Sequence, residues 1–469
     1  MLFNSTIFIL FAVVFFLVWY FAKRLSLNVR WGTIILFSLI FYGWWDWRFI
    51  FLIIFSGLID FFVALSMHRS GKHRKLFLWI SLTGNISSLL LFKYSEFIAQ
   101  NIDSFLEVLS ISWQITPHIP EFTLILPVGI SFYTFQSLSY TLDVYKKELE
   151  PTTNILHFFA YLCMFPQLVA GPIVRAKDLL PQLKNDCYTS EPERWMGFRL
   201  IVYGLFKKVV VADNLAPVVD KSFNYPIDSG VYWWVVITMF AVQIYCDFSG
   251  YSDIACGLAR WMGYRFCDNF NNPYIATSIQ DFWARWHISL STWFRDYVYI
   301  PLGGSRCKKW IVWRNIFYTM LLSGLWHGAS WNFLAWGGVH AAFLCIERQL
   351  GYHKYLLKYC FGRLFCWFIL IVQVWVGWVF FRAADFAQAL DILTLMFDFT
   401  SFLTPAVPFL YSRQMFILYM MMFLGMMYFF SLDQKWRKYT HYESLFLAIL
   451  IVIIIFFRGT GAAFIYFQF

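Results

Sequence analysis

The sequence predicts an all-α, polytopic integral membrane protein with about 10–12 spans and additional re-entrant and interfacial helices. Hydrophobic residues make up 60% of the 469 residues, aromatic residues 22% and charged residues only 14%. Soluble domains average about 25% charged residues. The mean hydropathy is +0.59. No water-soluble segment is long enough to stand apart, so we treat residues 1–469 as a single membrane domain.

The first five spans are joined by short loops. The first apolar run, near residues 3–22, is long enough to span a membrane. It lacks the basic n-region of a cleaved signal peptide, so we expect it to be retained. The next four spans are expected near residues 31–45, 48–66, 76–97 and 122–144.

Basic loops predict the orientation of these spans. Lys and Arg cluster near residues 23–30, 68–75, 145–152 and 306–314. Between Lys93 and Lys146 there is no Lys or Arg. The positive-inside rule therefore places the basic clusters in the cytoplasm, and the N-terminus and the loop around 99–121 outside.

After residue 150 the pattern becomes irregular. Residues 157–183 carry three prolines and a glycine within an apolar run. Backbone breaks at membrane depth are tolerated only where protein or a water-filled cavity satisfies the freed groups. We expect a re-entrant element here, with an ordinary Pro-kinked helix as the alternative. Residues 194–212 place Arg and Lys among apolar residues, which predicts an amphipathic or interface helix.

A long span is expected at residues 231–263, with polar side chains midway. These are Asp247, Ser249, Tyr251, Ser252 and Asp253. The two carboxylates either bond neighbouring helices or line a cavity. Later spans are expected near residues 330–347, 364–381, 414–431 and 442–457. Lys435, Arg437 and Lys438 predict a last cytoplasmic loop, which leaves the C-terminus outside.

The net charge of +10 would suggest nucleic-acid binding in a soluble protein. Here the basic residues lie in short loops, where they set orientation and meet anionic lipid head groups. Nucleic acid is therefore not an expected partner. The nine cysteines are scattered singly, without a C-x-x-C pair. This spacing indicates neither a metal site nor a disulfide framework.

Two histidines, His287 and His327, lie in segments otherwise suited to lipid. Ionisable groups at membrane depth are costly and usually mark a pathway or a reaction centre. His287 lies 12 residues before Tyr299, and His327 lies 13 residues after Arg314. In helices each histidine would sit roughly 18 to 20 Å from the basic loop, so the two depths match and both imidazoles could face one cavity. The alternative is that both are structural histidines that bond helices together.

The residues around His287 are unusually polar for a membrane helix. If this segment is one helix, Trp283 and Ser291 share a face with His287, and Asp281 and Arg285 form an i,i+4 ion pair on another face. Such a density of polar groups needs internal partners or water. A purely lipid-facing helix would not provide them.

Five motifs together resemble the membrane-bound O-acyltransferase family, and within it the bacterial alginate O-acetyltransferase-like branch. They are FPQLVAGPIVR (165–175), CDFSGYSDIACGLARWMG (246–263), NFNNPYIATSIQDFWARWHISLSTWFRDYVYIPLGG (269–304), GLWHGASWNFLAWGGVH (324–340) and the terminal FIYFQF. The resemblance covers most of the chain from about residue 120.

The resemblance implies helices around a central funnel or tunnel, through which an acyl group passes from a cytoplasmic donor to an acceptor on the far side. His327 matches the family's catalytic histidine and His287 its second signature histidine. We therefore expect generic spans in 1–120, an acyltransferase core in 121–348 and C-terminal spans in 349–469. The side chains near the histidines that we expect to bind substrate are Trp283, Arg285, Ser291, Trp326 and Asn332.

Acyl transfer from a thioester to a hydroxyl needs a base for the hydroxyl proton and support for the developing oxyanion. Burial favours the neutral imidazole, which is the form that a base requires. We assign this role to His327. His287 would polarise the acyl carbonyl or orient the donor arm.

The C-terminal FIYFQF contains Tyr466, a further catalytic candidate. The tail resembles the F-x-Y-F-x-F endings associated with an acyl-tyrosine in these acyltransferase systems. A tyrosyl ester suits a relay because phenolate, of pKa about 10, leaves more readily than an alkoxide. The alternative is an aromatic residue that anchors the last helix at the membrane interface.

The resemblance implies O-acetylation of an extracytoplasmic polysaccharide, such as alginate, cellulose, peptidoglycan or another envelope glycan. The donor would be acetyl-CoA or another acyl thioester, with no permanently bound cofactor. The expected partners are the lipid bilayer, the polysaccharide and an extracytoplasmic serine esterase-like acetyltransferase. The expected location is the bacterial inner membrane, with both termini extracytoplasmic. A lipid O-acyltransferase, a secondary transporter and a structural scaffold stay open as alternatives.

Overall fold

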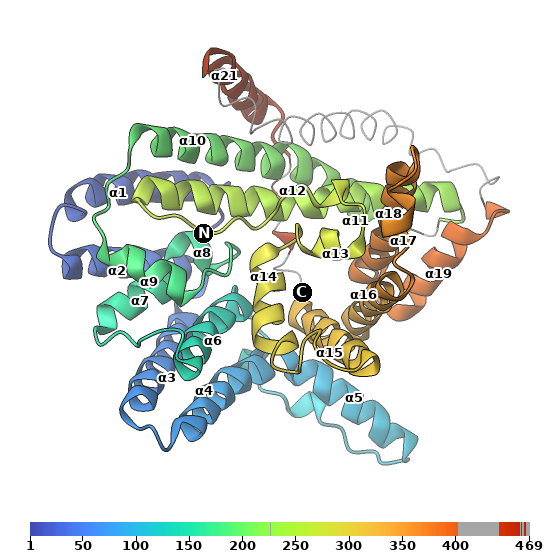
Figure 1. Cartoon of the computed structure of the whole chain (residues 1–469), viewed down its shortest axis with the longest axis horizontal. Helices are drawn as coiled ribbons and strands as arrows, with labels where there is room; N and C mark the ends of the chain where they lie inside the picture. Colours follow the sequence, from blue (N-terminus) through green and yellow to red (C-terminus); the bar gives the residue numbers. More distant parts are fainter. Residues whose placement is uncertain (226, 402–439, 460, 462–463, 466–469) are drawn as a thin grey trace. The chain divides into compact units, whose positions relative to one another are not determined.

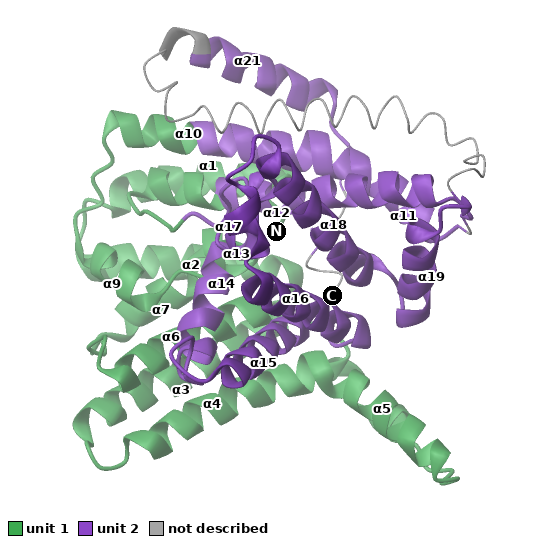
Figure 2. Ribbon diagram, turned by 45° about the vertical axis from the view of Figure 1, so that its right-hand side comes forward, with its two compact units in different colours: residues 1–198, 255–267 green, residues 199–254, 268–469 purple. Residues whose placement is uncertain are grey.

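The computed structural model describes residues 1–225, 227–401, 440–459, 461, 464 and 465, and every regular element in these residues is helical. The predicted all-α class is confirmed. Figure 1 shows the helices in chain order. The chain forms two compact units, coloured separately in Figure 2: unit 1 is 1–198 with 255–267, and unit 2 is 199–254 with 268–469. The span expected at 414–431 and the basic loop expected at 435–438 lie outside the described residues.

Two helices contribute to both units, α10 (Glu191–Leu205) and α12 (Gly230–Met262). The other elements of unit 1 are α1 (Thr6–Ala22), α2 (Leu27–Asp46), η1 (Trp47–Phe49), α3 (Ile50–Arg69), α4 (Arg74–Leu89), η2 (Leu90–Tyr94), α5 (Ser95–Val108), η3 (Thr116–His118), η4 (Glu121–Thr123), α6 (Ile130–Lys146), α7 (Ile155–Cys163), α8 (Phe165–Leu168) and α9 (Ala176–Lys184). Helices α1, α2, α3, α4 and α6 confirm the first five predicted helical segments.

The other elements of unit 2 are η5 (Phe206–Ala212), α11 (Asp213–Phe223), η6 (Pro273–Ile275), α13 (Ile279–Trp283), α14 (Ile288–Phe294), η7 (Arg295–Tyr299), α15 (Lys309–His327), α16 (Trp331–Leu350), α17 (Tyr352–Leu356), α18 (Gly362–Arg382), α19 (Phe386–Phe397) and α21 (Thr440–Phe456). Helices α16, α18 and α21 confirm three of the later predicted helical segments.

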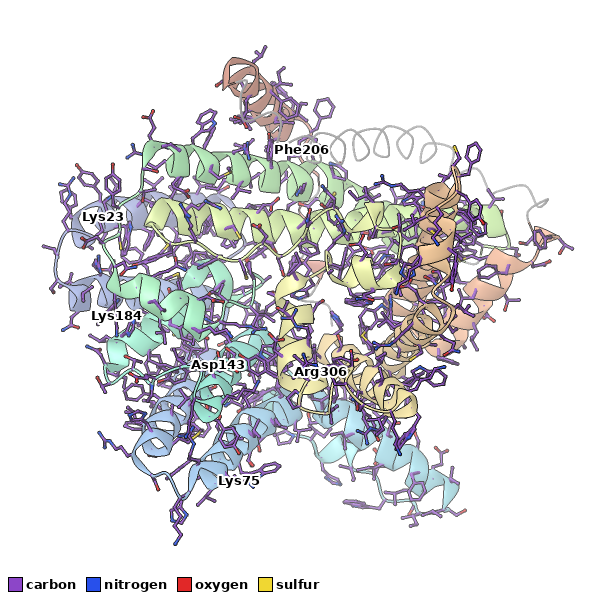
Figure 3. The ribbon with its side chains drawn as sticks, viewed as in Figure 1. Lys23, Lys75, Asp143, Lys184, Phe206 and Arg306 are labelled. Atoms are coloured by element: carbon purple, nitrogen blue, oxygen red, sulfur yellow. The ribbon has the colours of Figure 1, made fainter. Side chains whose placement is uncertain are left out.

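Several helical stretches are long and apolar enough to cross a membrane. Among the described residues, four such stretches occur: Leu27–Arg69, Arg74–Val108, Gly230–Met262 and Gly362–Arg382. Shorter apolar helices are Thr6–Ala22, Phe386–Phe397 and Glu443–Phe456. Lys75, in the first turn of α4, and Arg306, between η7 and α15, belong to two of the predicted basic clusters. Both are exposed (Figure 3).

One buried carboxylate joins α3, α4 and α6 within unit 1. Asp60 on α3 accepts hydrogen bonds from Ser81 Oγ at 2.5 Å and from Asn85 Nδ2 at 3.0 and 3.1 Å, both on α4. Ser137 Oγ on α6 donates to the same carboxylate. A buried charge is tolerated only with such partners. The polar side chains of these spans therefore fix how the three helices pack.

The irregular segment at 157–183 is broken, as predicted. It forms α7, the single turn α8 and α9, with residues 169–175 non-helical. Pro166 lies in the first turn of α8, where a missing N–H costs nothing. All of residues 157–174 are buried, so protein surrounds the backbone groups that the break frees. The alternative of one kinked helix is wrong.

The amphipathic or interface helix predicted at 194–212 is wrong in its second half, where the two lysines are buried instead of facing solvent or head groups. Helix α10 continues through the π-helical η5 into α11. Lys207 and Lys208 of η5 are both buried. Lys207 pairs with Asp253 at 2.7 Å and Lys208 with Asp247 at 2.6 Å, and these ion pairs compensate the buried charges. These contacts confirm that the two carboxylates of α12 bond a neighbouring helical segment.

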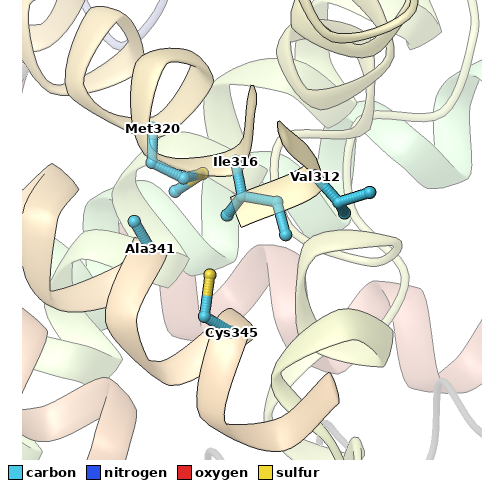
Figure 4. Packing of buried hydrophobic residues seen from close by; sticks show 5 residues of the cluster. All are labelled: Val312, Ile316, Met320, Ala341 and Cys345. Carbon is cyan, nitrogen blue, oxygen red and sulfur yellow. The ribbon is translucent and has the colours of Figure 1, made fainter. Parts of the chain in front are cut away.

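Helices α15 and α16 pack antiparallel around a small apolar cluster. Figure 4 shows its members, Val312, Ile316, Met320, Ala341 and Cys345. Two glycines lie where the helices approach closely. A Cβ on Gly337 would lie 2.4 Å from the Met320 carbonyl oxygen, and one on Gly324 would lie 2.1 Å from the Phe333 carbonyl oxygen. This packing positions the end of α15, where His327 lies.

Gly337→Ala is expected to lower the free energy of unfolding by about 1–3 kcal/mol, because the added Cβ forces the helices apart. The neighbouring Gly338→Ala is the matched control, since a Cβ there would only meet Leu321 Cδ2 at 3.9 Å. Thermal unfolding in detergent compares the two variants. Equal midpoints would contradict the close packing.

Candidate active site

His287 lies at a junction between two short helices. Helix α13 ends at Trp283, α14 begins at Ile288, and His287 takes a left-handed conformation with φ 42° and ψ 55°. The expectation of one helix through this segment is therefore wrong, and so is the helical face shared with Trp283 and Ser291. A non-glycine residue in this region costs about 1–3 kcal/mol. Surrounding contacts must hold the turn.

Asn269 supplies those contacts. Its main-chain oxygen accepts from Ile288 N–H at 2.9 Å. Its side-chain Oδ1 accepts from Ser289 N–H at 3.3 Å and Ser289 Oγ at 2.8 Å, and lies 3.1 Å from His287 Nδ1. Its Nδ2 donates to Ser252 Oγ on α12 at 3.1 Å. The buried Asn269 thus ties the His287 turn to the long helix α12.

The same contacts fix the tautomer of a neutral His287. Oδ1 of Asn269 accepts from Ser289 N–H, which can only donate, so this atom is the carbonyl oxygen. His287 Nδ1 must then carry a proton that it donates to Oδ1. In the neutral imidazole the lone pair is therefore on Nε2.

One indole contacts both predicted imidazoles. His287 is fully buried, and its ring centroid lies 4.6 Å from that of Phe248 and 5.8 Å from that of Trp326. The Trp326 ring lies 5.0 Å from that of His327. The structure thus brings the two histidines and Trp326 together inside unit 2.

His327 is the last residue of α15 and is 3% exposed. Its ring packs against those of Trp336 at 4.9 Å, Phe381 at 5.3 Å and Phe333 at 6.4 Å. The negative end of the α15 dipole would stabilise a positive charge that develops there. This environment suits a base that gains a proton during a reaction.

Two more of the predicted residues, Trp283 and Asn332, lie near His327. Trp283 packs against Trp336 at 5.6 Å and against His340 at 5.2 Å, and Trp336 in turn contacts His327. Asn332 is buried, and its Nδ2 donates to the Ala383 carbonyl at 2.9 Å. Both therefore lie on or beside the α16 helix that flanks His327.

Arg285 and Ser291 bond within the local chain. Arg285 Nε donates to Asp281 at 2.8 Å, which confirms the predicted ion pair, and its Nη1 donates to the Asn271 carbonyl at 3.3 Å. Ser291 Oγ donates to the Trp286 carbonyl at 3.1 Å. These contacts shape the turn before α14. Tyr466 lies outside the described residues.

Two side chains, the hydroxyl of Ser278 and the carboxylate of Glu347, accept from main-chain N–H groups at the start of α13. Ser278 Oγ accepts from Asp281 N–H at 3.0 Å as an N-cap. The buried Glu347 of α16 accepts from Ile279 N–H at 2.8 Å and Gln280 N–H at 3.3 Å. An anion at a helix N-terminus is favourable, so this contact anchors the His287 segment on α16.

Sequence reasoning missed Asn269, Phe248, Trp336 and His340 as neighbours of the site. Asn269 had a signal, because it is a polar residue in the motif that also holds His287. Among the residues that the structure describes, no group of three or more His, Cys, Asp or Glu side chains is placed to hold a metal ion.

Asn269→Ala is expected to slow any reaction that uses His287 by roughly 5- to 150-fold, which corresponds to about 1–3 kcal/mol for a lost buried hydrogen-bond partner. Asn315→Ala is the matched control, because Asn315 is equally buried and donates to the Gly304 carbonyl instead. Turnover and thermal stability are measured together. An equal loss of turnover in both variants would argue against a special role for Asn269.

Comparison with known proteins agrees with the motifs. The profile of MBOAT, the membrane-bound O-acyltransferase family, matches residues 71–353. A probable alginate O-acetylase, AlgI, of Pseudomonas aeruginosa is 39% identical over 408 residues, which cover 85% of this chain and 75% of that protein. A peptidoglycan O-acetyltransferase of Helicobacter pylori is 35% identical, over 84% of this chain and 79% of that protein. A teichoic acid D-alanyltransferase of Bacillus subtilis is 32% identical, over 49% and 60%.

Proposed function

Because the chain belongs to the membrane-bound O-acyltransferase family, we propose that it moves an acetyl group from a cytoplasmic thioester to an extracytoplasmic envelope polysaccharide. The protein is an O-acyltransferase that spans the membrane several times. The names of its relatives, an alginate O-acetylase and a peptidoglycan O-acetyltransferase, support acetyl as the group and a glycan as the acceptor. The observation that carries the proposal is that the buried imidazoles of His287 and His327 both pack against the Trp326 ring.

His327 acts as the general base. It takes the proton from the acceptor hydroxyl as the hydroxyl oxygen attacks the thioester carbonyl carbon. The new C–O bond forms, the C–S bond breaks, and the proton passes to the leaving thiolate, which departs as a thiol. The imidazolium formed on the way lies at the C-terminal end of α15, where the helix dipole offsets part of its burial cost.

His287 orients the donor arm. Its Nδ1–H is directed at Asn269 Oδ1, so a neutral ring offers an acceptor at Nε2. A hydrogen-bond acceptor at Nε2 can bind an amide N–H in the arm of the acyl thioester. Polarising the acyl carbonyl would instead need an N–H at Nε2. Of the two roles expected for His287, orientation of the donor therefore fits the tautomer.

Tyr466 is the first acceptor, and acetyl leaves it for the polysaccharide on the outer side. An extracytoplasmic serine esterase-like transferase would carry out this second transfer. The proposed location is the bacterial inner membrane, with the basic loops in the cytoplasm and both termini outside. Acetyl-CoA is the proposed donor.

The donor test uses the purified protein in proteoliposomes with radiolabelled acetyl-CoA or palmitoyl-CoA. Wild type is expected to release thiol from acetyl-CoA and to retain acetyl label, and His327→Ala to do neither. Preference for palmitoyl-CoA, with label recovered in the lipid fraction, would instead identify a lipid O-acyltransferase and overturn the proposal.

A further inference from the structure

Within the C-terminal tail, which we define as residues 457–469, Ile465 reaches the middle of α12. Ile465 is 3% exposed, and its main-chain N–H donates to Asp247 Oδ2 at 2.7 Å. Helix α12 runs from residue 230 to 262, so Asp247 lies near its centre. A main-chain N–H bound to a carboxylate is a charge-assisted contact that fixes the backbone whatever the side chain.

Asp247 belongs to a buried charged cluster. Lys208 Nζ lies 2.6 Å from Asp247 Oδ1 and 2.8 Å from Asp213 Oδ1, and all three side chains are at most 4% exposed. Lys208 thus contacts both carboxylates at once. Buried charges need such compensation. The N–H of Ile465 supplies an additional donor to the cluster.

The residue before Ile465 reaches the surroundings of His287. Phe464 is fully buried, with its ring 4.9 Å from that of Tyr251 and 5.8 Å from that of Phe248. Phe248 is the residue whose ring lies 4.6 Å from that of His287. One phenyl ring therefore contacts both the tail and the candidate active site.

The start of the tail is also held closely. Gly459 N–H donates to the Val209 carbonyl at 3.1 Å. A Cβ on Gly459 would lie 2.7 Å from the Asp213 carbonyl carbon and 2.9 Å from Asn214 N. A side chain at this position would force the tail away from α11. This second anchor lies against the backbone of Asp213, one of the two carboxylate residues that Lys208 contacts.

We propose that Lys208, Asp213 and Asp247 form a dock for the C-terminal tail, which presents Tyr466 to the histidine site. Tyr466 follows Ile465 directly in the chain. The inference rests on the proposed function, in which Tyr466 accepts the acyl group. Asp247 is a positioning residue, because its contact is with the tail backbone.

The neighbouring ion pair provides a matched control. Lys207 and Asp253 join the same two segments, η5 and α12, at 2.7 Å. The hydrogen bond from Ile465 goes to Asp247 rather than to Asp253. Removal of either carboxylate leaves a buried lysine without one of its carboxylate partners, so both variants carry the cost of a weakened buried ion pair. Only Asp247→Ala also removes the hydrogen bond to Ile465.

The test uses full-length protein in nanodiscs. Carboxypeptidase trimming beyond Ile465 is followed by mass spectrometry, and acetylation of Tyr466 from acetyl-CoA is measured on parallel samples. Asp247→Ala and Gly459→Val are expected to speed trimming at least tenfold and to lower Tyr466 acetylation at least tenfold. Asp253→Ala is expected to match wild type in trimming. Gly459→Val keeps the test decisive if Asp247→Ala does not fold.

The outcomes separate the dock from the relay. Equal trimming rates in wild type, Asp247→Ala and Gly459→Val would overturn the dock. Trimming of Asp253→Ala as fast as that of Asp247→Ala would also overturn it. If the dock variants expose the tail but wild-type Tyr466 never gains acetyl, the proposed relay fails and the dock stands without it.

Discussion

His327→Ala is expected to slow acyl transfer by about 10²–10⁴-fold, the range typical for loss of a general base. The side chain is packed among aromatic rings at the end of α15, so its removal leaves a cavity there and stability must be measured beside the rate. Single-turnover release of thiol from acetyl-CoA measures the chemical step. The amount of folded protein is measured by thermal unfolding of the same sample.

His157→Gln is the control for the loss of any buried histidine. His157 lies in unit 1, with Nδ1 2.9 Å from Thr152 Oγ1 and Nε2 2.9 Å from the Leu180 carbonyl. Its variant is expected to keep the rate of thiol release. A rate in His327→Ala within about twofold of wild type would remove His327 from the mechanism, because twofold is far below the contribution of a base.

Tyr466→Phe is expected to remove ester-linked acetate from the envelope polysaccharide without a change in thermal stability. The substitution deletes only the phenol oxygen that would form the tyrosyl ester and keeps the ring that an anchor would need. Alkali-labile acetate is measured on polysaccharide from cells in which the variant is the only copy.

Gln468→Ala tests whether any change in the tail has the same effect. It leaves the phenol in place, so polysaccharide acetate is expected to stay near the wild-type level. Undiminished acetate in Tyr466→Phe would mean that Tyr466 is an interfacial anchor and that acetyl passes to its acceptor directly.

Much of the fold follows from local sequence. Apolar runs predict α1 to α4, α12 and α18, because a span needs about 20 apolar residues whatever its neighbours are. The prolines within residues 157–183 predict the break at α8, because proline lacks the N–H that a helix needs. Local composition also singles out His287 and His327 as ionisable residues in apolar surroundings.

The contacts that shape the site could not be predicted in this way. The segment around His287 has a helical composition, and its break depends on Asn269, 18 residues earlier in the chain. From the sequence alone, Lys207 and Lys208 resemble residues at a membrane interface. Their carboxylate partners on α12 are evident only in the tertiary structure. The bond from Ile465 to Asp247 joins residues 218 positions apart. Such pairings depend on tertiary structure and leave no local periodicity.

In the proposed function, an acetyl group passes through the histidine site onto the chain's own tail. Its most direct test is mass spectrometry of the C-terminal peptide after one turnover with isotopically labelled acetyl-CoA. We expect labelled acetyl on Tyr466 of wild type and none in His327→Ala. Labelled acetyl on the polysaccharide, with Tyr466 unmodified at every time point, would contradict it.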